Sequence, residues 1–233
     1  MATPPPRFSP RAVTFLRALN RHNDREWFRE RKDVYERELR APMAALVERL
    51  GDDFRAFAPE LVATPKASMF RPYRDTRFSE DKSPIKTNVA AVFPWRGFGR
   101  TEGAALYLEL NTKTVLVAGG LYFATTAQLL AVREHLATHL AQFRSIVESP
   151  AFVRATGGLT GEQLQRVPRP FQKDHAAAEY LRHRQFLAWK EWPAAHATSP
   201  RFYGDVLRFF RVAAPLVRFL NAPLVAQRSR EIV

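Results

Sequence analysis

Two short runs around a three-residue turn constrain the fold of this chain more than any other feature. Residues 105–110 alternate between apolar and polar side chains, with leucine at every second position, and residues 114–118 form a second run rich in β-branched side chains. Alternation with a period of two is typical of a strand with one buried face. The intervening residues 111–113 are short enough for a hairpin. The pair therefore predicts an antiparallel sheet in the middle of the chain.

Helical periodicity dominates both sides of this region. Apolar residues between 12 and 19 recur at i, i+3, i+4 and i+7, which predicts a helix that begins after Ser9. Asn23 and Glu26 have the spacing of a capping box for a second helix. A continuous apolar stripe predicts one helix over residues 125–147, and a last helix is expected to follow Ser199 and Pro200.

Two further short strands are predicted at residues 66–70 and 88–93, and residues 149–200 are expected to form loops with short helices. These elements together predict a single α+β domain with a central, mainly antiparallel sheet flanked by N-terminal and C-terminal helices. We expect this domain to span residues 9–233 and to follow a flexible, proline-rich tail at residues 1–8.

Composition narrows the class of protein. A chain of 233 residues that is 46% hydrophobic can bury a sizeable core. No uninterrupted apolar run approaches the ~20 residues that cross a bilayer, so we expect no membrane association. The absence of cysteine excludes disulfides and thiolate sites, and it fits a cytoplasmic location. Neither a phosphate-binding Gly-x-x-x-x-Gly-Lys loop nor a Gly-x-Ser-x-Gly elbow is present, so P-loop NTPases and serine hydrolases are not expected.

The densest charge lies in residues 71–86, named here the polar segment. Its cations are the candidate ligands of a small anion, because guanidinium and ammonium groups bind phosphate and carboxylate oxygens; they are Arg71, Arg74, Arg77, Lys82 and Lys86. Asp75 and Asp81 are candidate supporting or acid–base groups. We expect the first three arginines and Asp75 to be partly buried and hydrogen-bonded to one another.

Two alternatives compete with an anion site. The charges of the polar segment can form a structural salt-bridge network without a ligand, with Ser79 capping a helix whose first turn holds Glu80 and Asp81. The triplet Glu80-Asp81-Lys82 also has the acid-x-lysine spacing of a metal-dependent phosphodiesterase. The net charge of +13 makes nucleic acid a candidate partner, although no motif indicates it.

Histidine adds one more candidate. His175 follows Lys173 and Asp174 in a compact polar triplet, and its pKa near neutrality suits an acid or base. No metal site or cofactor is predicted: His135 and His139 have i, i+4 spacing, but the Glu of a His-Glu-x-x-His motif is missing. Whether the chain is an enzyme, and in what oligomeric state it works, stay open at this stage.

The polar segment also carries a family resemblance. Its run Arg-x-x-Arg-Asp-x-Arg-Phe-x-x-Asp-Lys resembles the signature of domain-of-unknown-function family 2461, a mostly bacterial group. Other family elements are similar to residues 23–28, 119–122 and 173–184, so the resemblance covers roughly residues 8–220. It implies almost nothing about activity, because the family has no assigned function. Ile85 stands where the family usually has tyrosine, so we expect an apolar contact there.

Overall fold

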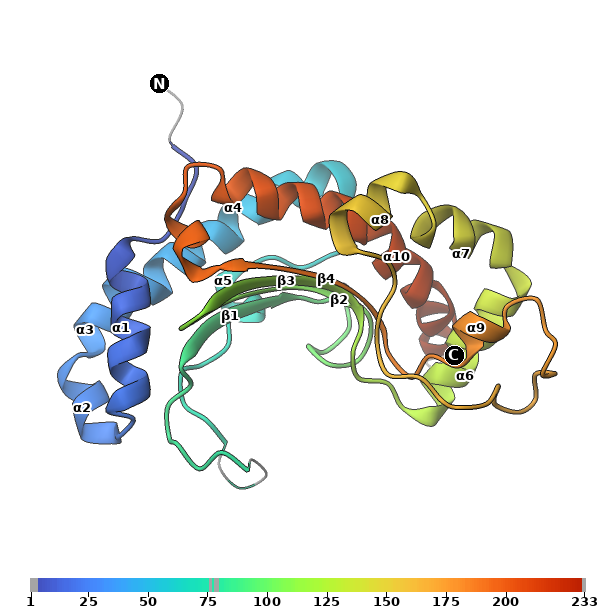
Figure 1. Ribbon diagram of the computed structural model, residues 1–233, viewed down its shortest axis with the longest axis horizontal. Helices are drawn as coiled ribbons and strands as arrows, with labels where there is room; N and C mark the ends of the chain where they lie inside the picture. The colour runs from blue at the N-terminus through green and yellow to red at the C-terminus, as the bar shows by residue number, and fades with distance from the viewer. Residues whose placement is uncertain (1–3, 76, 78–79, 232–233) are drawn as a thin grey trace. The chain divides into compact units, whose positions relative to one another are not determined.

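The computed structural model describes residues 4–75, 77 and 80–231 and confirms the predicted fold class, a single α+β domain with an antiparallel sheet (Figure 1). The strands are hydrogen-bonded in the order of the sequence: β1 (Asn88–Phe93), β2 (Ala105–Asn111), β3 (Thr114–Leu121) and β4 (Phe186–Pro193). The boundaries expected for the tail and the domain, 1–8 and 9–233, stay predictions. Phe8 is buried, and its N–H donates to the carbonyl of Ala197 at 3.0 Å.

The chain divides into two compact units. Unit 1 comprises Met1–Phe93, Tyr107–Val117 and Glu191–Arg208, and unit 2 comprises Pro94–Leu106, Ala118–Lys190 and Phe209–Val233. The strands β2, β3 and β4 therefore each contribute residues to both units.

The hairpin predicted at residues 105–118 is present. The side chain of Asn111 closes the turn, because its Oδ1 accepts hydrogen bonds from the N–H groups of Lys113 and Thr114, both at 2.8 Å. The leucines of β2 are fully buried, whereas Tyr107 and Glu109 are half-buried on the opposite face. The alternation in the sequence therefore corresponds to one core face and one polar face.

Unit 1 contains the N-terminal helices α1 (Pro10–Arg21), α2 (Arg25–Glu30), α3 (Lys32–Tyr35), a π-helical turn η1 (Glu36–Arg40), α4 (Ala41–Phe57) and α5 (Pro65–Ser68). It also contains the 3-10 helix η2 (Ala194–Thr198) from the C-terminal part of the chain. The helices α1, α2 and α3 lie side by side, drawn in blue in Figure 1. The apolar face predicted for the first helix is buried.

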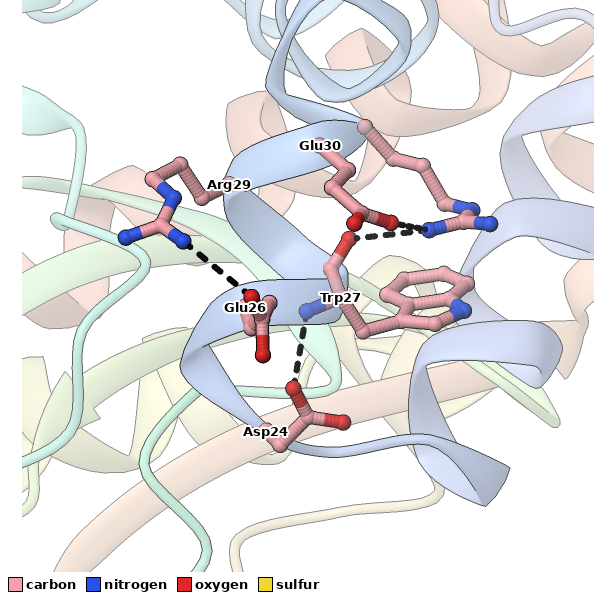
Figure 2. A network of polar contacts seen from close by, with 6 residues as sticks. Asp24, Glu26, Trp27, Arg29 and Glu30 are labelled. Carbon is pink, nitrogen blue, oxygen red and sulfur yellow. Dashed lines mark hydrogen bonds and ion pairs between the residues drawn. The ribbon is translucent and has the colours of Figure 1, made fainter.

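The N-cap of the second helix lies one residue later than predicted. Asp24, and not Asn23, is the N-cap of α2, since its Oδ1 accepts a hydrogen bond from the N–H of Trp27 at 2.7 Å (Figure 2). Asn23 is instead bound to the backbone of Ile85. The Arg31 guanidinium lies 4.7 Å from the centre of the Trp27 ring, a cation–π contact that covers this turn.

The strand predicted at residues 66–70 is only partly correct. Thr64 caps a short helix whose first residue is Pro65, so the chain turns into α5 instead of extending. Only the end of the predicted strand pairs with β1: Met69 forms an antiparallel bridge with Ala91, and the N–H of Phe70 donates to β1 at 3.1 Å.

The helices of unit 2 are α6 (Thr126–Thr138), α7 (Leu140–Val147), α8 (Pro150–Thr156), α9 (Ala178–Leu181) and the larger part of α10 (Phe202–Glu231). The single helix predicted over residues 125–147 is wrong: His139, at φ −115° and ψ 36°, separates α6 from α7. The strand β4 was expected to be loop. Its sequence shows no clear alternation, because its two tryptophans flank Lys190 and Glu191. In the structure, the second half of the strand is not buried, so it has no continuous apolar face.

In the described part of the chain, one helical stretch, Phe202–Ser229, is long and apolar enough to cross a membrane by length and composition alone. The arginines Arg211 and Arg218 interrupt it, which is why no continuous apolar run was predicted. Buried side chains on α10, among them Phe210 and Leu220, are typical of a core helix in a soluble domain.

Candidate functional site

The two halves of the polar segment pair with each other. Tyr73 and Ile85 form an antiparallel bridge, and the N–H of Lys86 donates to the carbonyl of Pro72 at 2.8 Å. Asn23 fixes this pairing from outside, because its amide donates to the carbonyl of Ile85 at 2.8 Å and accepts from the same residue's N–H at 3.0 Å. Ile85 is fully buried, which agrees with the apolar contact expected there.

Between the described residues of the polar segment, the structure gives two ion pairs that share no residue. Arg77 binds Asp75 through two parallel hydrogen bonds of 3.0 and 2.9 Å, and these bonds lower the pKa of Asp75 to about 2. Arg74 binds Asp81 at 2.9 Å. The expected single, partly buried network is therefore wrong: the Arg74 side chain is 23% exposed, whereas that of Arg77 is 77% exposed and Arg71 is also exposed. The polar segment is too short to bury all of its charged side chains.

The helix predicted after Ser79 is not formed by residues 80–87, and Ser79 itself lies outside the described residues. Asp81, expected in the first helical turn, instead accepts a hydrogen bond from the N–H of Ser83 at 2.9 Å, and this contact lowers its pKa. Lys82, next to it, is exposed.

A cavity of about 210 Å³ lies beside β1 and β2 in unit 1, lined by Phe70, Arg74, Lys86, Thr87, Asn88, Ala90 and Tyr107. Two of the predicted anion ligands, Arg74 and Lys86, therefore meet at one site although 12 positions separate them in the sequence. The other three, Arg71, Arg77 and Lys82, are exposed and do not line it.

Aromatic rings form one wall of the cavity. The Lys86 Nζ lies 5.1 Å from the centre of the Phe70 ring, and the rings of Phe70 and Tyr107 are 6.4 Å apart. A cation beside an apolar wall is less screened than one in water, so an anion that reaches it is bound more strongly.

The carboxylate of Glu109, which is not among the lining residues, accepts three hydrogen bonds. The hydroxyl of Tyr107 donates to it at 2.6 Å, the amide of Asn88 at 2.8 Å and the amide of Asn111 at 3.0 Å. Burial, with the nearby charge of Glu109, raises the pKa of Tyr107, which therefore keeps its proton across the physiological range.

Sequence reasoning missed this second half of the site. The signal was present on the polar face of β2, where Tyr107, Glu109 and Asn111 occupy every second position. Alternation indicates that such residues share a face, but it does not tell which face opens into a cavity.

His175 belongs to unit 2, whereas the cavity belongs to unit 1. It is half-buried, and its Nδ1 accepts a hydrogen bond from the N–H of Ala177 at 3.0 Å, which gives the ring a local structural role. Across the residues that the structure describes, no three His, Asp or Glu side chains gather as they would around a metal ion.

Comparison with known proteins places the chain in a family. No curated protein and no solved structure matches it. A family model described as conserved hypothetical protein (DUF2461) matches residues 11–219, which is most of the chain. The family suspected from the sequence is thus shown by a match over residues 11–219, and the chain belongs to the DUF2461 family.

Proposed function

We propose that this protein binds a small anionic ligand, bearing phosphate or carboxylate, in the cavity lined by Arg74 and Lys86. The observation that carries the proposal is the convergence of two cations from opposite halves of the polar segment on one partly apolar cavity. Structural ion pairs alone do not require a cavity.

The orientation of Arg74 supports this proposal. Its Nε donates to the carbonyl of Ser83 at 3.1 Å, and its Nη2 binds Asp81 at 2.9 Å. These contacts with described residues hold the guanidinium in one orientation and leave the Nη1 N–H groups for an anion. A preorganised fork binds an oxyanion with a smaller loss of side-chain entropy than a mobile one.

Two lysines of the polar segment provide a matched test. Lys86 lines the cavity, whereas Lys82 is exposed and does not. Isothermal titration with inorganic phosphate and with succinate should show binding to the wild type. We expect Lys86→Gln to weaken it about tenfold or more, and Lys82→Gln to leave it within about twofold, because a contact to a charged group contributes about 1.5–3 kcal/mol. Equal weakening by both variants would indicate a diffuse charge effect and contradict a site in the cavity.

Two alternatives predict different results. Nucleic-acid binding, which the net charge of +13 favours, should show affinity that falls steeply with salt, because counterions are released from the phosphates. A salt-bridge scaffold, which the pairs Arg74–Asp81 and Arg77–Asp75 favour, should bind none of these anions and only lose stability in Arg77→Ala. We also propose a cytoplasmic location, supported by the absence of cysteine.

A further inference from the structure

We infer that the ligand of this cavity carries a hydrogen-bond donor, a hydroxyl or an amino group, beside its anionic group, and that the hydroxyl oxygen of Tyr107 accepts from that donor. The inference rests on the proposed function and specifies its ligand class as a hydroxylated or amino-substituted acid.

The argument begins with the single proton of the Tyr107 hydroxyl. That proton is donated to Glu109 at 2.6 Å, a short distance that is typical of a hydrogen bond to a charged oxygen. A phenol has one O–H, so its oxygen has only acceptor capacity left for any other group. Tyr107 lines the cavity and therefore meets a ligand as an acceptor.

The surroundings hold the proton in this direction. An ionised carboxylate only accepts hydrogen bonds, and Glu109 also receives the amides of Asn88 and Asn111 at 2.8 and 3.0 Å. If Tyr107 turned its O–H toward a bare anion, the half-buried Glu109 would lose its shortest hydrogen bond. Leaving a desolvated charged acceptor short of a partner is unfavourable.

The charges around the cavity agree with a ligand of mixed character. Lys86 and Arg74 attract an anionic group, but Asp81 binds Arg74 and the carboxylate of Glu109 is hydrogen-bonded to the Tyr107 hydroxyl. An anion is thus attracted at one side and repelled at the other. A donor placed against Tyr107 removes this mismatch. The volume of about 210 Å³ is roughly that of seven waters at about 30 Å³ each, enough for a four-carbon acid.

Three acids with the same carbon skeleton test the inference. Succinate carries only carboxylates, malate adds a hydroxyl, and aspartate adds an ammonium. For the wild-type chain, isothermal titration should give a Kd about tenfold lower for malate and for aspartate than for succinate, the size expected for one buried hydrogen bond. In Tyr107→Phe this preference should disappear, so that succinate, malate and aspartate bind with Kd values within about twofold of one another.

A second variant keeps the test informative if Tyr107→Phe does not fold. Glu109→Gln preserves shape but adds an N–H that can donate to the Tyr107 oxygen, so the hydroxyl proton becomes available to the ligand. The roughly tenfold preference for malate over succinate should then disappear, as in Tyr107→Phe. If both variants unfold at a lower temperature than the wild type but keep the preference for malate, Tyr107 and Glu109 have a structural role only.

The outcomes separate this inference from the proposed function. If the wild type binds all three acids with equal Kd, the donor requirement is wrong and the anion site stands. If it binds none of the three and inorganic phosphate also fails to bind, the proposed function itself is wrong. If malate and aspartate bind more tightly than succinate, the donor requirement is supported. If Lys86→Gln also weakens the binding of all three acids alike whereas Lys82→Gln does not, the anion site is supported as well.

Discussion

Gly120 shows how one residue can decide whether two strands approach each other. Its φ is +133°, a conformation that side chains other than glycine rarely adopt, and a Cβ built there would collide with the carbonyl oxygen of Phe186 in β4. The backbone of β3 is therefore close to β4 because position 120 has no side chain.

We predict that Gly120→Ala lowers the free energy of unfolding by about 3 kcal/mol or more, because backbone strain and overpacking each cost about 1–3 kcal/mol. Gly204→Ala is the matched control: Gly204 lies in α10 with open space around it, so added helix propensity should stabilise the chain by up to about 1 kcal/mol. Urea unfolding of the two variants measures both effects. A Gly120→Ala chain as stable as the wild type would show that β3 can move away from β4.

At the scale of an element, the polar segment is positioned by a contact from far away in the sequence. The amide of Asn23 binds both backbone groups of Ile85, 62 residues further along the chain. This contact fixes the second half of the polar segment, which carries Lys86. The cavity therefore depends on the turn between α1 and α2.

Asn23→Ala should cost about 2 kcal/mol of stability, because it leaves two part-buried backbone groups without partners. It should also speed hydrogen exchange at the Ile85 amide and raise the Kd for succinate. Asp24→Ala is the control, since it removes the cap of α2 at a cost of about 1 kcal/mol without touching Ile85 (Figure 2). If the two variants gave the same exchange rate at Ile85, the Asn23 contact would not be what holds the segment.

For the whole molecule, stability should fall in acid. Every carboxyl in the described part of the chain whose pKa is clearly shifted has a lowered pKa, namely Glu38, Asp75, Asp81 and Glu102. A carboxyl with a lowered folded pKa stabilises the fold above its unfolded value and loses that contribution as pH falls through the folded value. The loss that comes from these carboxyls therefore begins near pH 4.5, the ordinary value for Glu, and continues to about pH 2, where Asp75 titrates.

Ser9→Ala tests one part of this acid dependence. The Ser9 hydroxyl donates to Glu38 at 2.6 Å and is the main cause of that residue's lowered pKa. The variant should unfold more easily than the wild type at pH 7, and the difference in free energy of unfolding should shrink at pH 3. Thr14→Ala is the control, because the Thr14 hydroxyl donates to the carbonyl of Pro10 within α1 and not to a carboxylate. Its difference in free energy of unfolding from the wild type should not depend on pH. Urea unfolding at both pH values measures this; a constant difference for Ser9→Ala would contradict it.

What the sequence determined by itself is the local part of the structure. The β2–β3 hairpin follows from alternation and from Asn111, and the burial of the first helix follows from its periodicity, since these signals depend on residues a few positions apart. The polar segment also indicated Arg74 and Lys86, because its charge density is visible in the sequence.

Only the tertiary structure decided which charges meet. The sequence ranks Arg71, Arg74 and Arg77 alike, but the pairing of Tyr73 with Ile85 directs Arg74 to the cavity and leaves the other two exposed. The strand β4 and the contacts that Tyr107 and Asn88 make with Glu109 depend on neighbours far apart in the chain. A side chain's partner across a sheet is set by strand order and register, and a local pattern carries information about neither.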